Sequence, residues 1–120
     1  VNSAPLLYEG AGITPKDVSI AEIYDPFTFM CMTHIEDFGL VKKGNIGGWV
    51  TAGHNRLDGT LPVNTHGGNL SEAYIIGMTH IREAVEQLRG TAVNQVEGAE
   101  VALVTGGPAA LPVSGTLLRR

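Results

Sequence analysis

The fold is decided by residues 18–38, VSIAEIYDPFTFMCMTHIEDF, where a short apolar run is followed directly by a helical repeat. The run at 18–24 alternates incompletely between apolar and polar side chains, which predicts a buried strand that Asp25-Pro26 breaks. Apolar side chains then recur at helical spacing, and proline suits a first helical turn, so we expect a helix from about Pro26 to Phe38. A strand that leads into a helix is typical of α/β proteins.

The segments on either side continue this alternation of helices and strands. Residues 3–9 predict a short helix stopped by Gly10 and Gly12. Towards the other end, VALVT at 101–105 has the uninterrupted apolar character of a central strand, and residues 111–118 predict its partner strand. The order of elements predicts an α/β fold in which helices pack on a mixed sheet.

Residues 71–90 contain the clearest helical pattern of the chain. Ser71 is a suitable N-cap and Gly90 a suitable stop, and apolar side chains recur between them at steps of four and three. This spacing predicts an amphipathic helix with one apolar stripe facing the core. The stripe consists of Tyr74, Met78, Ile81, Val85 and Leu88, and the residues lying off it are Arg82, Glu83, Glu86 and Arg89.

Residues 39–68 differ in kind from the segments around them, since they hold eight of the sixteen glycines and show little periodicity. They predict a long loop with one brief strand at Leu61 and Val63. Loops of this length inside a compact domain are usually functional. We therefore expect residues 1–120 to form one domain whose Gly-rich loop at 39–68 contributes to an active site.

The composition excludes several classes of protein. Eight Lys and Arg against twelve Asp and Glu give a net charge of −4, which argues against general binding to nucleic acid. No apolar run reaches the length of a membrane span, and no signal peptide opens the chain. The one cysteine, Cys31, fits a reducing compartment, so we expect a cytoplasmic location. The chain begins at Val1, and we expect it to be a fragment of a longer protein.

None of the four histidines belongs to a recognisable metal-binding motif, so we expect no metal site. His34 and His80 lie in predicted helices, where a buried or capping histidine is favoured. His66 lies in NTHGG at 64–68, directly before a predicted helix, where glycines let the backbone approach a ligand and free N–H groups favour negative charge. A turn that contains glycine for conformational reasons explains the same pattern equally well.

Three further side chains are candidates for chemistry. Cys31 lies in a predicted helix between two methionines, with no base or cation implied nearby, so we interpret it as a small buried hydrophobic residue rather than a nucleophile. Tyr24 ends the predicted strand, at the place where ligands usually bind in α/β sheets. Tyr74 follows the glycine-rich loop, although its position on the apolar stripe is equally typical of a core residue.

Two motifs resemble the thiolase superfamily. AEIYDPFT at 21–28 resembles the strand-to-helix turn in which degradative thiolases carry Asn-Glu-Ala-Phe and their lipid-transfer-protein relatives carry His-Asp-x-Phe. Asn64-x-x-Gly67-Gly68 followed by Ser71 resembles the family's Asn-x-x-Gly-Gly block, which leads to Gly-His-Pro. The resemblance covers essentially the whole chain. It implies the C-terminal half of such a protein, an α/β unit with a mixed sheet packed with helices, whose partner is an N-terminal half outside this sequence.

The chain departs from thiolases at the positions that carry their chemistry. Tyr24 stands where the family has Asn or His, and Tyr74 stands where it has the histidine of Gly-His-Pro. The late Cys-x-Gly motif maps to VTG at 104–106, which has no cysteine, and the main nucleophilic cysteine of the family belongs to the N-terminal half. A Claisen condensation needs those groups, so this half cannot support it in the usual way.

Tyrosines at these two positions resemble the thiolase-like aldolases that shorten steroid side chains on coenzyme A. The resemblance implies retro-aldol cleavage of a β-hydroxyacyl-CoA, which releases a ketone and propionyl-CoA from a steroid thioester. Coenzyme A is then part of the substrate, and no separate cofactor is expected. Such a cleavage needs a proton acceptor and a proton donor but no covalent nucleophile.

The resemblance also implies the site residues of this reaction. Tyr24 and Tyr74 would form the acid/base pair, without an assignment of which is acid and which is base. A phenol would need its pKa lowered from about 10 to act as a base at neutral pH. The residues that would orient the thioester carbonyl or a water are Asn64, His66, Gly67 and Gly68, and Asp25 would hold the loop or Tyr24 in place.

Two other functions stay open. An acyl-CoA acyltransferase or thiolase would draw its nucleophilic cysteine from the N-terminal half, and a catalytically silent subunit would retain only the binding of lipid or acyl-CoA. The resemblance further implies a homodimer and a small partner protein with an OB fold and a zinc ribbon. Because thiolase sites lie between two similar halves, we expect the 120-residue chain alone to be inactive.

Overall fold

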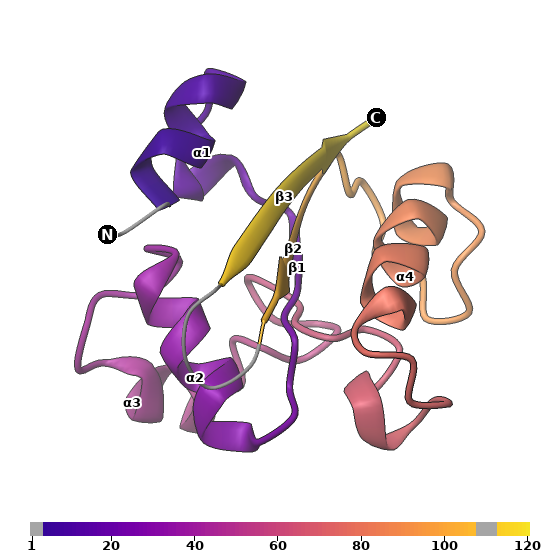
Figure 1. Cartoon of the computed structure of the whole chain (residues 1–120), viewed down its shortest axis with the longest axis horizontal. Helices are drawn as coiled ribbons and strands as arrows, with labels where there is room; N and C mark the ends of the chain where they lie inside the picture. The colour runs from indigo at the N-terminus through magenta and orange to yellow at the C-terminus, as the bar shows by residue number, and fades with distance from the viewer. Residues whose placement is uncertain (1–3, 108–112) are drawn as a thin grey trace.

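A three-stranded sheet lies at the centre of the computed structural model, which describes residues 4–107 and 113–120. β1 (Ile20–Glu22) runs parallel to β2 (Val101–Gly106), and β3 (Ser114–Arg119) runs antiparallel along the other edge of β2 (Figure 1). The sheet is therefore mixed, as the sequence predicted. The pair 101–105 and 111–118 is confirmed as neighbouring strands, although residues 111 and 112 lie outside the described residues.

Helices cover both faces of this sheet. They are α1 (Ala4–Ala11), η1 (Pro15–Asp17), α2 (Thr28–Asp37), α3 (Ile46–Thr51), η2 (Gly68–Leu70) and α4 (Met78–Arg89), where η marks a single 3₁₀ turn. α1, α2 and α3 lie on one side of the sheet and α4 lies on the other (Figure 1). This arrangement confirms the predicted α/β class. Across the described residues, no helix is both long and apolar enough to cross a bilayer.

Side chains on the two faces of the sheet pack into two separate apolar cores. Successive strand residues point to opposite faces, so Ile20 and Ala102 pack towards α4 while Ala21 and Leu103 pack towards α1 and α2. By the same alternation, Glu22 points towards α4 and is fully buried. A carboxylate in that position needs polar partners, because an unpaired charge in the interior is costly.

The helix predicted after Ser71 begins later and buries a different face. α4 starts at Met78 with Gly77 as its N-cap, and Tyr74 lies in the loop before it. Met78 and Ile81 of the predicted stripe are 55% and 41% exposed. The residues of α4 that are buried are Thr79, His80, Glu83, Ala84, Gln87 and Leu88.

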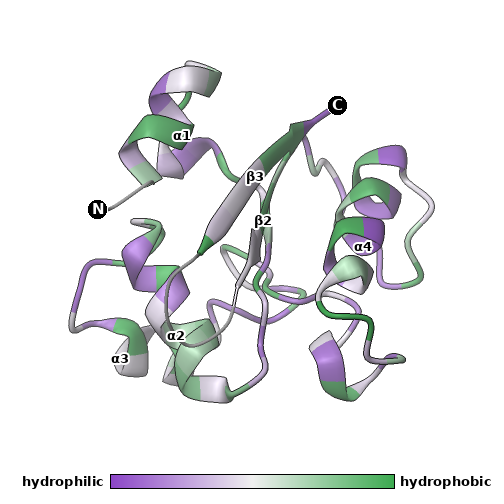
Figure 2. Cartoon of the chain, in the orientation of Figure 1, coloured by the Kyte–Doolittle hydropathy of each residue, from purple (hydrophilic) through white to green (hydrophobic). Residues whose placement is uncertain are grey.

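Polar partners on the sheet explain this orientation of α4. Both hydrophobic and hydrophilic residues occur along the helix (Figure 2), and the hydrophilic ones include buried residues. Glu83 and Gln87 turn inward because Glu22 and Thr65 meet them with hydrogen-bonding groups, as described below. Met78 and Ile81 of the apolar stripe are therefore left on the outer side of the helix, while Leu88 stays buried.

Two other predicted segments differ from the structure. The loop predicted at 39–68 contains α3, whose sequence IGGWVT is too short and too rich in glycine to show a helical period. Val63 forms a single parallel bridge to Ala21, which is what remains of the brief strand predicted there. The strand predicted at 18–24 pairs only over β1, because the backbone N–H and carbonyl of Ile23 bond to the Asn64 side chain, which lies outside the sheet.

Candidate active site

Tyr24 and Tyr74 meet at their hydroxyl groups. The two phenolic oxygens lie 2.7 Å apart, in a hydrogen bond that either group is able to donate. Tyr24 is buried, with 5% of its surface exposed, whereas Tyr74 is 61% exposed. One hydroxyl group of the pair is therefore held inside the protein, and the residue carrying the other lies at the surface.

Contacts from β2 and α4 hold the Tyr24 ring in place. The Tyr24 N–H donates to Thr105 Oγ1 at 3.2 Å, and the ring packs edge-on against His80 with ring centres 5.9 Å apart. The hydrogen bond to Tyr74, followed by burial, raises the pKa of Tyr24 to about 12. Tyr24 therefore keeps its proton at neutral pH.

Asp25 ties the segments around this pair together. Its Oδ1 accepts a hydrogen bond from His80 Nε2 at 3.0 Å and another from the Asn69 N–H at 3.1 Å. Burial favours the neutral carboxyl group, but these hydrogen bonds outweigh it and hold the pKa of Asp25 below its ordinary value. Gly68 makes the approach possible, because a Cβ at that position would collide with Asp25 Oδ2. The carboxylate thus anchors η2 and α4 to the end of β1.

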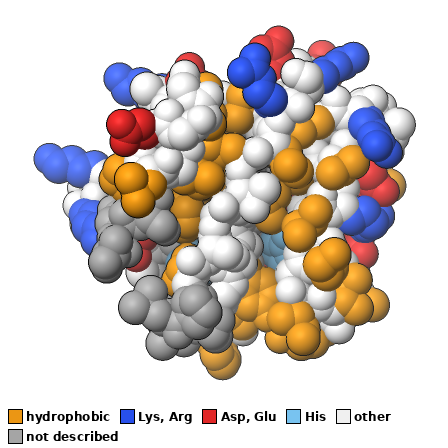
Figure 3. Space-filling model, turned by 45° about the horizontal axis from the view of Figure 1, so that its top comes forward, with side chains coloured by type: hydrophobic (Ala, Val, Ile, Leu, Met, Phe, Trp, Pro, Cys, Tyr) orange, Lys and Arg blue, Asp and Glu red, His pale blue; other side chains and the backbone are white. Residues whose placement is uncertain are grey.

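A surface cavity of about 760 Å³ lies at this place, and Tyr74 lines it. Its other lining residues are Asp25, Pro26, Phe27, Thr28, Cys31, Asn69 and Leu70. The space-filling view shows hydrophobic side chains gathered over the α4 side of the molecule (Figure 3). The cavity therefore combines a mainly apolar wall with a phenolic hydroxyl and a carboxylate, which suits a substrate with an apolar body and a polar reacting end.

Asn64, His66 and Gly67 line a second cavity, of about 570 Å³, that shares no lining residue with the first. Asn64 uses both ends of its carboxamide within the protein: Oδ1 accepts from the Ile23 N–H at 2.6 Å, and Nδ2 donates to the Ile23 carbonyl at 2.9 Å. The structure therefore brings Tyr24, Tyr74 and Asp25 together. The Asn64 side chain instead binds the backbone at the end of β1.

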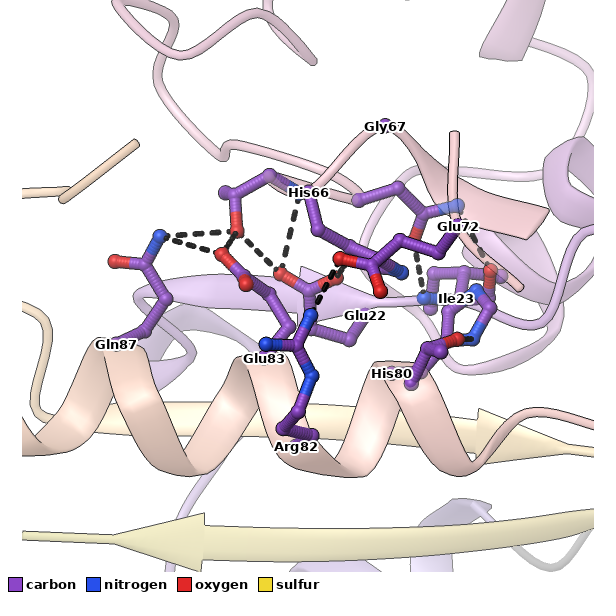
Figure 4. A network of polar contacts seen from close by, with 12 residues as sticks. Glu22, Ile23, His66, Gly67, Glu72, His80, Arg82, Glu83 and Gln87 are labelled. Atoms are coloured by element: carbon purple, nitrogen blue, oxygen red, sulfur yellow. Dashed lines mark hydrogen bonds and ion pairs between the residues drawn. The ribbon is translucent and has the colours of Figure 1, made fainter. Parts of the chain in front are cut away.

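A buried polar network joins this loop to α4 (Figure 4). Thr65 Oγ1 lies 2.8 Å from Glu22 Oε1 and 2.6 Å from Glu83 Oε1, and Gln87 Nε2 donates to Thr65 Oγ1 at 3.0 Å. His66 Nδ1 lies 3.1 Å from Glu22 Oε2, and the His66 side chain is 2% exposed. His66 is thus a support inside the protein, with its ring turned to a carboxylate rather than to solvent.

The ionisation of His66 couples this network to pH. Burial on its own lowers the pKa of His66, but the contact with Glu22 and the negative charges of Glu83 and Glu72 outweigh it, so that the pKa is raised above its ordinary value of 6.5. A raised histidine pKa stabilises the folded state below the unfolded pKa, and this contribution is lost as the pH rises through the folded pKa. We therefore expect the free energy of unfolding to fall as the pH rises from below 6.5 through that raised value.

Thermal unfolding measured across about pH 5 to 9, on either side of the ordinary histidine pKa, checks this expectation. Glu22→Gln removes the charge that faces His66 and is expected to flatten the slope in this range. Glu86→Gln is the matched control, since Glu86 pairs with Arg82 at the surface, and it should leave the slope unchanged. If Glu22→Gln keeps the full slope, another group is responsible.

The structure also places the cysteine and the two helical histidines that the sequence singled out. Burial, helped by the charges of Asp25 and Glu22, raises the pKa of Cys31 to about 12, so its thiol stays protonated at neutral pH. His34 and His80 are buried in their helices, as predicted. Among residues 4–107 and 113–120, no three His, Cys, Asp or Glu side chains gather as a metal-binding group.

Sequence reasoning missed several contacts around the candidate site. Glu22 carried a usable signal, because a carboxylate inside an otherwise apolar strand must have polar neighbours. His80 was predicted to be buried, but its bond to Asp25 was not foreseen, since the two residues are 55 positions apart. Nothing in the sequence pattern singled out Asn69, because it lies in a segment without hydrophobic periodicity.

Comparisons with known proteins found similar sequences and a similar solved structure. Residues 1–118 match the family described as Thiolase C-terminal domain-like. The chain is 47% identical over 88 residues to 17-hydroxy-3-oxo-4-pregnene-20-carboxyl-CoA lyase of Mycobacterium tuberculosis, a match that covers 73% of this chain and 23% of the relative. It is 43% identical over 88 residues to the steroid side-chain-cleaving aldolase of Thermomonospora curvata, covering 73% of this chain and 22% of the relative.

A solved structure is similar over nearly the whole chain. The Ltp2-ChsH2(DUF35) aldolase superposes with a TM-score of 0.91 at 39% sequence identity, covering 97% of this chain and 30% of the other. The chain thus spans less than a quarter of the length of the two curated relatives and under a third of the solved one.

Proposed function

The chain belongs to the thiolase family, in its C-terminal-domain-like group, and from this premise we propose that the protein containing it is a thiolase-like aldolase. Its substrate is a β-hydroxyacyl-CoA, and within that class a thioester carried on a steroid side chain. The products are a ketone and propionyl-CoA. The similarity to two steroid side-chain lyases supports the reaction class and the substrate class.

The observation that carries the proposal is the 2.7 Å contact between the hydroxyl groups of Tyr24 and Tyr74 at the wall of a cavity. Tyr74 lines the cavity and is the group that touches the substrate. Tyr24 lies behind it with its pKa raised to about 12, so it keeps its hydrogen and donates it to the Tyr74 oxygen. Tyr24 thereby stabilises the phenolate form of Tyr74, which is the form that accepts a proton from the substrate.

The reaction balances without a further reactant. Tyr74 removes the proton of the β-hydroxyl group, the oxygen forms a double bond to the β carbon, and the bond between the α and β carbons breaks. The electron pair of that bond remains on the α carbon as the enolate of the thioester. The proton taken from the hydroxyl group then returns to the α carbon, which yields propionyl-CoA and restores the tyrosine pair.

Product analysis of the complete protein tests this proposal. A panel of α-methyl-β-hydroxyacyl-CoA thioesters with a tertiary β-hydroxyl group, with and without a steroid body, should yield propionyl-CoA and a ketone, with the steroid thioester cleaved fastest. The assay is run with and without a partner protein of the OB-fold and zinc-ribbon type, which we also propose because the name of the solved relative joins two components. Release of free CoA together with a longer acyl product would identify a transferase instead.

A variant of Cys31 distinguishes the proposed aldolase mechanism from a mechanism in which a cysteine of this chain is the nucleophile. We expect Cys31→Ala to retain most of the cleavage activity, because a thiol with a pKa of about 12 is not a nucleophile at neutral pH. Steady-state kinetics of the variant, with Thr33→Ala on the exposed side of α2 as the control, measures this. Loss of activity in Cys31→Ala alone would contradict the expectation.

A further inference from the structure

The carboxamide of Asn69 is buried without a hydrogen-bond partner. Neither its Nδ2 nor its Oδ1 is reached by solvent, and neither contacts a donor or acceptor among the described residues. A buried polar group left unpaired destabilises the folded state, and native proteins keep few such groups. By contrast, the carboxamide of Asn64 is bonded at both ends and that of Asn94 donates to the Thr65 carbonyl.

The position of Asn69 suggests what satisfies this group. Asn69 lines the same cavity as Tyr74 and Asp25, and its own N–H is fixed to Asp25 Oδ1 at 3.1 Å. Asp25 already accepts two hydrogen bonds, and the Tyr74 hydroxyl is bonded to Tyr24. Asn69 thus holds, just behind the wall of the cavity, a donor and an acceptor that no described protein group uses.

The chemistry of the bound substrate supplies a matching group. In the cleavage proposed above, negative charge develops on the thioester oxygen as the enolate forms, and a neutral donor placed there in advance lowers the barrier. The ionised Asp25 cannot serve, because it only accepts hydrogen bonds and would repel an oxyanion. No intramolecular hydrogen bond holds the carboxamide of Asn69, so turning it towards the cavity breaks none.

We propose that Asn69 is a substrate-contacting residue whose Nδ2–H donates to the thioester oxygen of the bound acyl-CoA, an inference that rests on the proposed aldolase function. The backbone contact with Asp25 positions Asn69 beside the tyrosine pair. The free protein tolerates the unpaired amide because the substrate completes its hydrogen bonds.

Asn69→Leu, made in the complete protein, tests this assignment through two readouts that move in opposite directions. Leucine has a similar shape without polar atoms, so the melting temperature is expected to rise by about 2 °C or more, because an unpaired buried group is removed. The kcat for cleavage is expected to fall by about 10²-fold with little change in KM, which is the usual effect of losing one oxyanion donor. Asn69→Ala, which adds no bulk, should show the same loss of kcat.

Asn94→Leu is the control for the stability readout, and it should lower the melting temperature because it breaks a hydrogen bond that exists in the free protein. A similar drop for Asn69→Leu would mean that the carboxamide has a structural partner elsewhere in the complete protein, and would overturn the proposal. Unchanged kcat would also overturn it, as would a rise in KM alone. If Tyr74→Phe abolishes cleavage while both Asn69 variants remain active, the aldolase function stands and only this inference fails.

Discussion

Replacing Tyr74 with Phe is expected to lower kcat for cleavage of a β-hydroxyacyl-CoA by about 10²- to 10⁴-fold, the range for losing a positioned acid or base. The change deletes the one oxygen that lies both at the cavity and 2.7 Å from the Tyr24 hydroxyl group. Because Tyr74 is 61% exposed, the melting temperature should barely change. Steady-state kinetics on the complete protein, together with thermal unfolding, measures both effects.

Tyr24→Phe is expected to lower kcat in the same direction, and the double variant should be little worse than Tyr74→Phe alone, because the two hydroxyl groups act as one unit. Tyr8→Phe is the matched control. Tyr8 is also a buried tyrosine, but its hydroxyl group donates to the Phe38 carbonyl at 2.9 Å and lies outside the cavity. That variant should lose about 1–3 kcal/mol of stability and keep its turnover. Full activity in Tyr74→Phe would contradict the aldolase proposal.

Gly68→Ala is expected to damage both stability and activity. Gly68 has φ +71°, a conformation that costs other residues free energy, and a Cβ there would collide with the Asp25 carboxylate. Strain and collision together should lower the free energy of unfolding by about 2–6 kcal/mol. Displacing Asp25 also releases its bond to the Asn69 N–H, so kcat/KM should fall by about 10²-fold, as for other misplaced sites.

Gly90→Ala separates the two causes. Gly90 has φ +74°, nearly the same conformation, but no atom lies within 4 Å of the position of an added Cβ. This variant should lose only the conformational part, about 1–2 kcal/mol, and leave kcat/KM unchanged. Chemical denaturation and kinetics of the two variants side by side measure the difference. Equal losses of stability in both would rule out a collision with Asp25.

The fold was largely predictable because most of its helices and strands have recognisable local sequence patterns. The uninterrupted apolar run at 101–105 and the strand-to-helix turn at Asp25-Pro26 need no distant partner to be recognised. The inward face of α4 could not be predicted in this way, since Glu83 turns inward only because Glu22 and Thr65 face it from the sheet side. The same pattern without those partners would have buried Ile81 instead.

The candidate site likewise contains residues that could be predicted from the sequence and residues that could not. Tyr24 and Tyr74 could be singled out because they replace residues that carry the chemistry of a family, and the structure places their oxygens together. The hydrogen bonds of Asn64 to the Ile23 backbone could not be predicted from its motif, because they depend on packing between residues 41 positions apart. Asn69 became visible only through a missing contact, which no sequence pattern encodes.

The middle strand of the sheet has a consequence for how the protein is made. β2 lies in the last fifth of this sequence, yet it pairs with Ile20–Glu22 near the other end. It also supplies the Thr105 hydroxyl group that accepts a hydrogen bond from the Tyr24 N–H. Until Val101–Gly106 have been synthesised, both tyrosines are already part of the nascent chain, but the sheet that positions them lacks its middle strand. Long-range pairing of this kind delays assembly. The nascent chain therefore acquires the geometry of its tyrosine pair only near the end of this segment's synthesis.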